Sequence, residues 1–293
     1  MGGAGMTRTL PVLTVLAALV AVWYAASVWL NAAWVFDQAA RAGTAVTWAE
    51  VIPQTMAQDR PLLPPPHQVA AHLWQGVAGQ APTSRRSLIY HGWITLEATL
   101  AGFALGIAVG MGLAMAIVRF RAMEMGVMPW AIISQTIPIV ALAPMIVVLT
   151  AQMGIQDRLV PKAVISAYLS FFPVLVGMVK GLRSPDAMQI DQMRTWSASE
   201  AQMFLRLRLP ASLPYLFASL KVAIAAALVG AIVGELPTGA VAGLGARMLI
   251  GSQFGEPLIM WSALFAAAIL AGVLILIVGQ AERVAGRRMG VRA

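Results

Sequence analysis

Long apolar runs without charge are the feature that most constrains this chain. A helix needs about 20 residues to cross the hydrocarbon core of a membrane. Backbone groups inside lipid must bond to one another, and a helix achieves this within one segment. The sequence therefore predicts an all-α, polytopic membrane protein with six transmembrane helices. The runs are Leu10–Leu30, Ala98–Val118 (whose helix could begin as early as Leu88), Met125–Gln156, Ala163–Val179, roughly Ala211–Glu235 and Pro257–Ala281.

Composition excludes most other classes of protein. Only 11% of the 293 residues are charged and 59% are hydrophobic, whereas a soluble domain carries about 25% charged residues. This excludes an ordinary soluble enzyme and a disordered chain. The sequence has no Cys and three His, so it offers neither thiolate metal ligands nor a metal-binding His cluster. No Ser/His/Asp set can be placed on one side of the membrane, and we expect no metal and no catalytic residues.

Positive charge predicts the orientation. With the N-terminus inside, 12 of the 20 Lys and Arg residues fall in inside segments and 7 in outside segments. Cytoplasmic loops carry the excess of Lys and Arg, so both termini are predicted to be cytoplasmic. The net charge of +8 fits contact with anionic membrane lipid. No nucleic-acid-binding motif accompanies it, so we expect no nucleic acid.

The longest outside segment runs from about residue 31 to residue 87. Within it Leu62–Pro66 (LLPPP) is predicted to be extended, because consecutive prolines favour polyproline II. The following stretch, His67–Val77, is predicted to be a short amphipathic helix. The preceding run, Leu10–Leu30, is longer than the apolar core of a signal peptide, which is about 7–15 residues. We therefore expect it to be a retained anchor.

The inside segment 184–210 is too polar to lie in lipid and too long for a simple turn. Its sequence, SPDAMQIDQMRTWSASEAQMFLRLRLP, mixes Met and Trp with charged residues. This pattern predicts two short amphipathic helices joined near Ser197. Either Ser197 or Ser199 would cap the second helix, with Glu200 in its first turn. The segment could lie on the inner membrane surface, or it could fill a groove on a cytosolic partner.

The same segment resembles the EAA loop of bacterial ABC-importer permeases. The small residue, the Phe, the aliphatic residue and the Leu-Pro pair of that loop have their counterparts here at the family's spacing. Asp191-Gln192-Met193 stands where the family has Glu-Ala-Ala, and Ser197 replaces Gly. QTIPIVALAP at 135–144, LPYLF at 213–217 and GAIVGE at 230–235 resemble the nitrate/sulfonate/taurine-like branch. The resemblance covers about Pro64 to Arg283.

The resemblance implies a type I importer permease core at 88–283, after an anchor and periplasmic segment at 1–87 and before a basic tail at 284–293. Segment 184–210 would couple the chain to a dimer of cytoplasmic ABC ATPases in the inner membrane. A second copy of the chain and a periplasmic solute-binding protein would complete the importer. The residues that would couple to the ATPase are Asp191, Ser197, Glu200, Phe204, Leu207, Leu209 and Pro210.

No cofactor is expected on this chain itself. It lacks a GxxxxGK[ST] phosphate loop, so ATP and Mg would bind to the partner ATPase. The chain is therefore not expected to be an enzyme. The resemblance implies a small polar or anionic solute, of the nitrate, sulfonate or taurine type, or a pyrimidine vitamin precursor.

Two charged residues within or beside the spans are candidates for the solute pathway. Glu97 is interfacial if its span begins at Ala98, but it lies about 13 Å inside if the helix begins at Leu88. Lys221 lies about ten residues inside the fifth run. It could extend its amine to the interface, meet an anionic solute or pair with a carboxylate.

Three further candidates are polar or break a helix. Gln135 and Thr136 lie beside Pro138 in the third run. They could line a pathway where the proline interrupts the backbone ladder, or bond to a neighbouring helix. Glu235 ends the fifth run, before the loop Leu236–Glu256. By resemblance this loop could form part of an outer gate, and the alternative is an ordinary connection.

Regularly spaced glycines predict close helix packing. Gly102, Gly106 and Gly110 form one ladder in the second run, and Gly230 and Gly234 form another in the fifth. Small residues at this spacing let helix backbones approach closely. The packing could be within one chain or between two copies.

Two other functions remain open on the residues alone. An ion-coupled secondary transporter would need acids buried at mid-membrane and inverted repeats, and no repeat is detectable. An intramembrane enzyme would need paired catalytic groups at one depth, which the runs do not offer.

Overall fold

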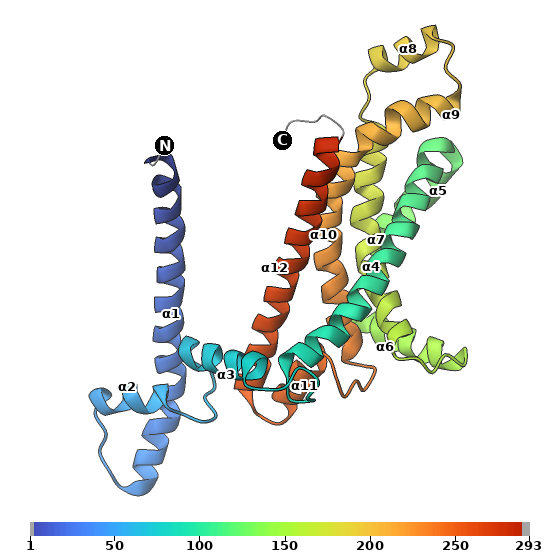
Figure 1. The fold of residues 1–293 in the computed structure, drawn as a ribbon. Coiled ribbons are helices and arrows are strands. Elements are labelled where there is room, and N and C mark those ends of the chain that lie inside the picture. The colour runs from blue at the N-terminus through green and yellow to red at the C-terminus, as the bar shows by residue number, and fades with distance from the viewer. Residues whose placement is uncertain (1–2, 289–293) are drawn as a thin grey trace. The chain divides into compact units, whose positions relative to one another are not determined.

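The computed structural model describes residues 3–288, and every regular element in that range is a helix (Figure 1). The prediction of an all-α chain is confirmed. In chain order the helices are α1 (Gly3–Ala42), α2 (Trp48–Met56), α3 (Pro66–Ala78), α4 (Leu88–Arg119), α5 (Arg121–Ser134), α6 (Ile139–Gln152), α7 (Leu159–Leu182), α8 (Ala187–Thr195), α9 (Glu200–Met203), the π-helix η1 (Phe204–Arg208), α10 (Leu209–Glu235), α11 (Leu244–Gln253) and α12 (Pro257–Arg288). The last five residues of the predicted basic tail, 289–293, lie outside the described residues.

Five helices within residues 3–288 are long and apolar enough to cross a membrane. The third predicted run, Met125–Gln156, is interrupted beside Pro138, and the predicted count of six spans holds if the interrupted run is one span. Its residues form α5 and α6, whose axes are bent by 104° at the break, so that the pair is either a broken sixth span or a re-entrant loop. Pro138 is the N-cap of α6. A proline lacks the N–H that a continuing helix needs, and it disfavours the helical conformation of the residue before it.

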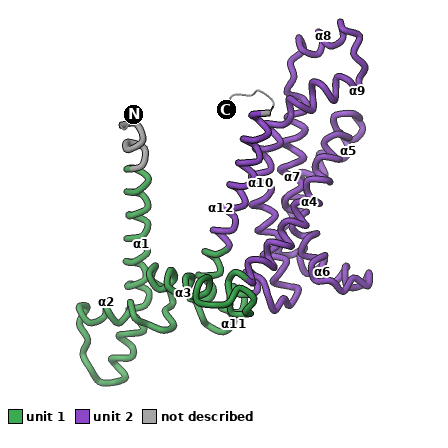
Figure 2. Tube along the Cα trace, in the orientation of Figure 1, with its two compact units in different colours: residues 1–89, 247–266 green, residues 90–246, 267–293 purple. Residues whose placement is uncertain are grey.

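The chain forms two compact units (Figure 2). Unit 1 comprises residues 1–89 and 247–266, and unit 2 comprises residues 90–246 and 267–293. The first boundary lies close to the predicted one after residue 87, but 247–266 joins the N-terminal unit. Side-chain contacts inside unit 1 explain this. Nδ1 of His72 lies 3.0 Å from Ser262 Oγ, and the ring of Trp23 stacks on Phe265 at a centroid distance of 5.6 Å.

In unit 1 a single asparagine fixes the proline-rich segment. Asn31 Oδ1 accepts hydrogen bonds from the Leu62 N–H (2.7 Å) and the Leu63 N–H (3.2 Å), and its Nδ2 donates to the Leu63 carbonyl (2.8 Å). Pro65 has φ −67° and ψ 151°, which are polyproline II angles. The extended prediction for Leu62–Pro66 holds only at its proline-rich centre, because Leu62 and Leu63 form bends and Pro66 begins α3. The predicted helix that follows is observed as α3.

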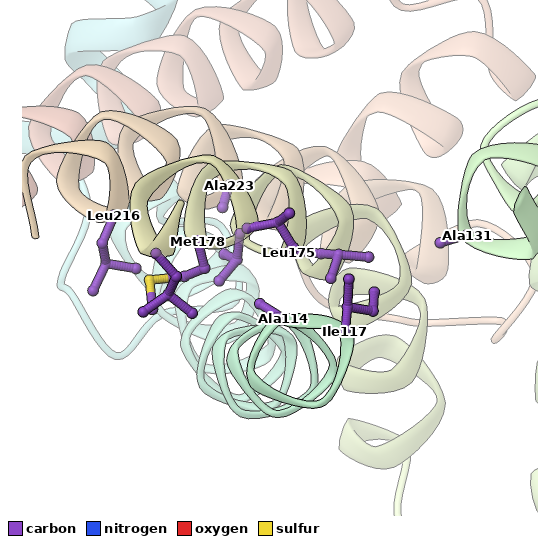
Figure 3. Close-up of a cluster of buried hydrophobic side chains, with 10 residues drawn as sticks. Ala114, Ile117, Ala131, Leu175, Met178, Leu216 and Ala223 are labelled. Carbon is purple, nitrogen blue, oxygen red and sulfur yellow. The ribbon is translucent and has the colours of Figure 1, made fainter. Parts of the chain in front are cut away.

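In unit 2, α7 packs between α4 and α10. Its Leu175 and Met178 are fully buried, together with Ile117 of α4 and Ala223 of α10. Figure 3 shows these side chains meeting between the three helices. Lipid tails are as apolar as these side chains, so helix association depends on close packing rather than on exclusion of water.

Both glycine ladders lie at this packing. A Cβ on Gly110 of α4 would lie 2.6 Å from the Phe171 carbonyl oxygen, and a Cβ on Gly230 of α10 would lie 2.6 Å from Ser166 Cα. Gly102 and Gly106 face Ser166 and Ser170 of α7, and Gly234 faces Lys162. The structure therefore places the ladders against α7 within the chain, not on a face presented to a second copy.

Candidate functional site

Glu235, at the end of α10, is the centre of a buried polar network in unit 2. Its side chain is fully buried. Oε1 accepts a hydrogen bond from the Thr95 hydroxyl (2.8 Å), and Oε2 accepts one from the Gly245 N–H (2.7 Å). The carboxylate thus joins α4 to the first turn of α11 and holds the start of the loop that follows α10.

The loop itself is fixed by two further bonds to α4. The Leu244 N–H donates to Thr95 Oγ1 (2.9 Å), and the Gly243 N–H donates to Nδ1 of the buried His91 (3.0 Å). Gly243 has φ +130°, and a Cβ there would overlap the Glu235 carboxylate. Only glycine combines this backbone angle with such a close approach. The connection after Glu235 is therefore a specifically bonded turn. The hydrogen bonds that His91 and Thr95 make to this turn were not predicted from the sequence.

The other pathway candidates do not join this network. Glu97 is exposed on α4 and forms no ion pair with any described residue. Lys221 forms an ion pair with Glu282 of α12, which is the carboxylate pairing left open by the sequence. Glu282 itself was not predicted.

Gln135, Thr136 and Pro138 lie together at the break between α5 and α6. Gln135 Nε2 donates to Ser134 Oγ (3.2 Å), and the exposed Thr136 donates to the Ile133 carbonyl (2.8 Å). The Tyr168 hydroxyl of α7 donates to the Ser134 carbonyl. The side chains of Gln135 and Thr136 therefore bond to groups at the end of α5 itself. The Tyr168 hydroxyl of α7 adds a hydrogen bond at the break between α5 and α6.

Segment 184–210 forms the predicted pair of helices, α8 and α9, at one end of the unit 2 helices (Figure 1). Asp186 caps α8 and Ser199 caps α9. In each case the residue at N3, Gln189 or Gln202, completes a capping box. Of the two serines considered, Ser199 is the cap. These reciprocal bonds satisfy the free N–H groups of each first turn, so the helices need few contacts with the rest of the unit.

Ser197 makes the turn between the two helices. It has φ +56°, the single positive value among the described residues other than glycine. This is the left-handed region that glycine adopts without steric cost. The tight turn that the family makes with glycine is therefore formed here by serine.

The second helix of the segment continues directly into a span. Residues Glu200–Glu235 form one helical stretch. Pro210 directly follows the π-turn η1, in which the Leu209 N–H bonds to the Phe204 carbonyl, and Pro214 lies inside α10. The stretch is about 54 Å long at 1.5 Å per residue, and it connects segment 184–210 to Glu235.

The candidate coupling residues differ in exposure. Asp191, Ser197, Glu200 and Pro210 are exposed, whereas Phe204, Leu207 and Leu209 are half-buried. Phe204 and Leu209 pack against the core cluster of unit 2, so Phe204 is only partly free to meet a partner. The large apolar side chains that the segment exposes are Met188 (80%), Trp196 (68%) and Leu205 (60%).

The family model described as "Binding-protein-dependent transport system inner membrane component" matches residues 106–291, more than half of the chain. The chain belongs to this family of ABC-importer permeases. The permease is thus a multi-pass inner-membrane protein and a transport component rather than an enzyme. The family also removes the two alternatives, a secondary transporter and an intramembrane enzyme.

Three relatives confirm the branch suggested by the sequence. The riboflavin transport system permease protein of Chloroflexus aurantiacus is 30% identical over 76% of this permease and 78% of its own length. The formylaminopyrimidine transport permease protein of Halalkalibacterium halodurans is 36% identical over 55% of this permease and 64% of its own length. A putative aliphatic sulfonates transport permease protein of Bacillus subtilis is 25% identical over 58% and 59%.

A solved structure agrees on the fold. The inward-facing MetNI methionine ABC transporter matches with a TM-score of 0.56, covering 68% of this permease and 95% of that chain at 19% identity. Identity at this level shows the fold alone. The predicted type I importer permease-like core is confirmed.

Proposed function

We propose that this permease forms the solute pathway of its importer and is driven by a separate ABC ATPase that docks on segment 184–210. The supporting observation is the segment itself, in which α8, its C-cap and η1 expose three large apolar side chains, Met188, Trp196 and Leu205. An amphipathic helix presenting such side chains suits a groove on a partner. Trp is among the residues that contribute most to interface energies, and Trp196 is therefore the expected centre of the contact.

The continuous stretch Glu200–Glu235 suggests how docking acts on the pathway. A displacement of the docked segment moves α10 directly, because no loop intervenes. At its far end α10 carries Glu235, which holds the turn at Gly243–Gly245. We propose that this turn belongs to the outer gate and that the ATPase changes it through α10.

We propose the remaining partners by analogy with other importers of this family. ATP and Mg bind to the ATPase dimer, a second copy of the permease completes the pathway, and a periplasmic binding protein delivers solute. Both termini face the cytoplasm, as the distribution of Lys and Arg indicates. The solute is a small polar molecule. The relatives named for riboflavin and formylaminopyrimidine are 30% and 36% identical, and those named for nitrate and aliphatic sulfonates are 29% and 25% identical. We therefore propose either a heteroaromatic vitamin or vitamin precursor or a small anion as the solute.

The docking proposal is tested with Trp196→Ala and a matched control. The ATPase is first identified by purifying the tagged permease from its host, and its affinity for the purified permease is then measured. Removing a central interface Trp costs about 2 kcal/mol or more, so Trp196→Ala is expected to weaken binding at least about 30-fold. Trp74→Ala, at a site in α3 with 71% exposure, is expected to leave affinity unchanged. Unaltered affinity in Trp196→Ala and in Trp196→Asp would contradict docking at this segment.

A further inference from the structure

Unit 1 contains a polar cavity that the transport role of the permease does not explain. Its volume is about 290 Å³, and its lining is rich in side chains that donate hydrogen bonds. The lining residues are His72, Gln75, Gly76, Gln80, Arg86 and Arg247. Binding pockets for small molecules begin at about 300 Å³, so the cavity has room for one small polar group.

The two arginines of the cavity are not held in ion pairs by the described residues. Neither Arg86 nor Arg247 forms an ion pair within the described part of the chain. Nε of Arg247 is buried without a hydrogen-bond partner among those residues. A buried donor left unsatisfied costs about 1–3 kcal/mol, and more when it is charged. Burial also lowers the pKa of Arg247, because a buried guanidinium is less well solvated than an exposed one.

One carboxylate lies close enough to matter. Glu256 acts electrostatically on both Arg247 and His72. Its ion-pair partner, however, is Arg60, with Nη2 3.7 Å from Oε1. Arg60 offsets the charge of Glu256, so the cavity keeps an excess of positive charge.

We propose that this cavity binds an oxyanion, the phosphate or sulfonate group of a ligand, between the guanidinium groups of Arg86 and Arg247. Guanidinium groups bind phosphate oxygens in pairs of parallel hydrogen bonds, and the amides of Gln75 and Gln80 add neutral donors. An anion here satisfies the buried Arg247 Nε and compensates the excess charge. The proposal is independent of which solute the importer carries.

The position of the cavity suggests two sources for the oxyanion. Arg86 precedes the start of α4 at Leu88, and the His72 side chain contacts Ser262 in the second turn of α12. The cavity therefore lies beside the beginnings of two candidate spans, where headgroups would meet a chain inserted in a membrane. The exposed Trp74 on α3 is of the residue type enriched at membrane interfaces. The oxyanion is either a lipid headgroup phosphate or a free anion.

Two measurements on the purified full chain separate these sources. Titration calorimetry with inorganic phosphate, at ionic strength held constant with chloride, detects the free anion. Native mass spectrometry after incubation with phosphatidylglycerol detects retained lipid. Arg86→Gln and Arg247→Gln are expected to weaken the productive interaction about tenfold or more. Arg41→Gln is the control, because Arg41 is an exposed arginine of unit 1 that pairs with Asp37.

Each outcome has one meaning. Phosphate binding without retained lipid assigns a free oxyanion, and lipid retention that depends on both arginines assigns a headgroup. Arg86 is exposed, so Arg86→Gln remains informative even if Arg247→Gln fails to fold. Binding of neither probe, or equal binding by the unaltered chain and both variants, overturns the proposal.

Discussion

Glu235→Gln tests the proposed outer gate most directly. The buried carboxylate accepts one hydrogen bond on each oxygen, from Thr95 at 2.8 Å and from the Gly245 N–H at 2.7 Å. Glutamine has nearly the same shape but only one side-chain oxygen. One of the two hydrogen bonds is then accepted by a neutral oxygen, and the other is lost because its donor meets the NH2 group of the amide. Bonds to charged groups contribute about 1.5–3 kcal/mol and neutral ones about 0.5–1.5 kcal/mol. The variant should therefore destabilise the bonded turn by about 1–3 kcal/mol.

The assay uses the absence of Cys from the chain. A single cysteine introduced at Ala246, which is 1% exposed, reacts with a maleimide only when the turn opens. The labelling rate follows the population of the open form when opening and closing are fast. A loss of 1–3 kcal/mol raises this population, and hence the labelling rate, by about 5- to 150-fold.

A second glutamate serves as the control for this substitution. Glu256→Gln makes the same chemical change at a half-exposed carboxylate whose partner, Arg60, is 3.7 Å away. Exposed pairs of this kind contribute about 0–1 kcal/mol, so labelling of the Ala246 cysteine should hardly change. The reasoning is refuted if Glu235→Gln leaves the labelling rate unchanged, or if both variants raise it equally.

Three further variants test separate features. Ser197 has φ +56°, so Ser197→Gly should stabilise the turn of segment 184–210 by about 1 kcal/mol. Limited proteolysis at this turn should slow about fivefold, and faster cleavage would contradict the prediction. A Cβ on Gly106 would overlap Ser170 of α7, so Gly106→Ala should destabilise unit 2 by about 1–3 kcal/mol. The melting temperature in detergent should fall, and an unchanged melting temperature would argue against this packing. Burial and Arg247 lower the pKa of His72 from 6.5. The unfolded chain therefore takes up a proton first, and stability should fall as pH drops below about 6.5. His72→Gln should reduce this fall, and His67→Gln should not.

The sequence predicted the helices well, because a span is a local property. Apolar runs located the five long helices, and the proline-rich segment and α3 followed from local residue preferences. The break within Met125–Gln156 also has a local cause. Pro138 was seen in the sequence, but uncharged length alone does not distinguish a kinked span from two helices bent by 104°.

The polar network was predictable in part. His91, Thr95 and Thr99 lie four residues apart on one face of α4, and a polar stripe on an apolar helix is a recognisable signal. Glu235, the partner of Thr95, is 140 residues away from it, and no local pattern joins the two. The same limit applies to Lys221 and Glu282, whose pairing depends on how α10 and α12 pack.

Segment 184–210 shows how motif spacing and exposure carry different information. The spacing of the EAA loop selected Phe204, yet the structure packs Phe204 against the core of unit 2 and exposes Trp196. A residue can be required because it attaches the segment to α10 or because it touches the ATPase. Loss of Phe204 should therefore disturb transmission through α10 as well as docking, whereas loss of Trp196 should weaken docking alone. Comparing Trp196→Ala with Phe204→Ala in the ATPase-binding assay and the Ala246 labelling assay separates the two roles. Both variants are labelled in the absence of ATPase. If Phe204→Ala raises the labelling rate of the Ala246 cysteine and Trp196→Ala leaves it unchanged, then α10 links the coupling segment to the outer turn.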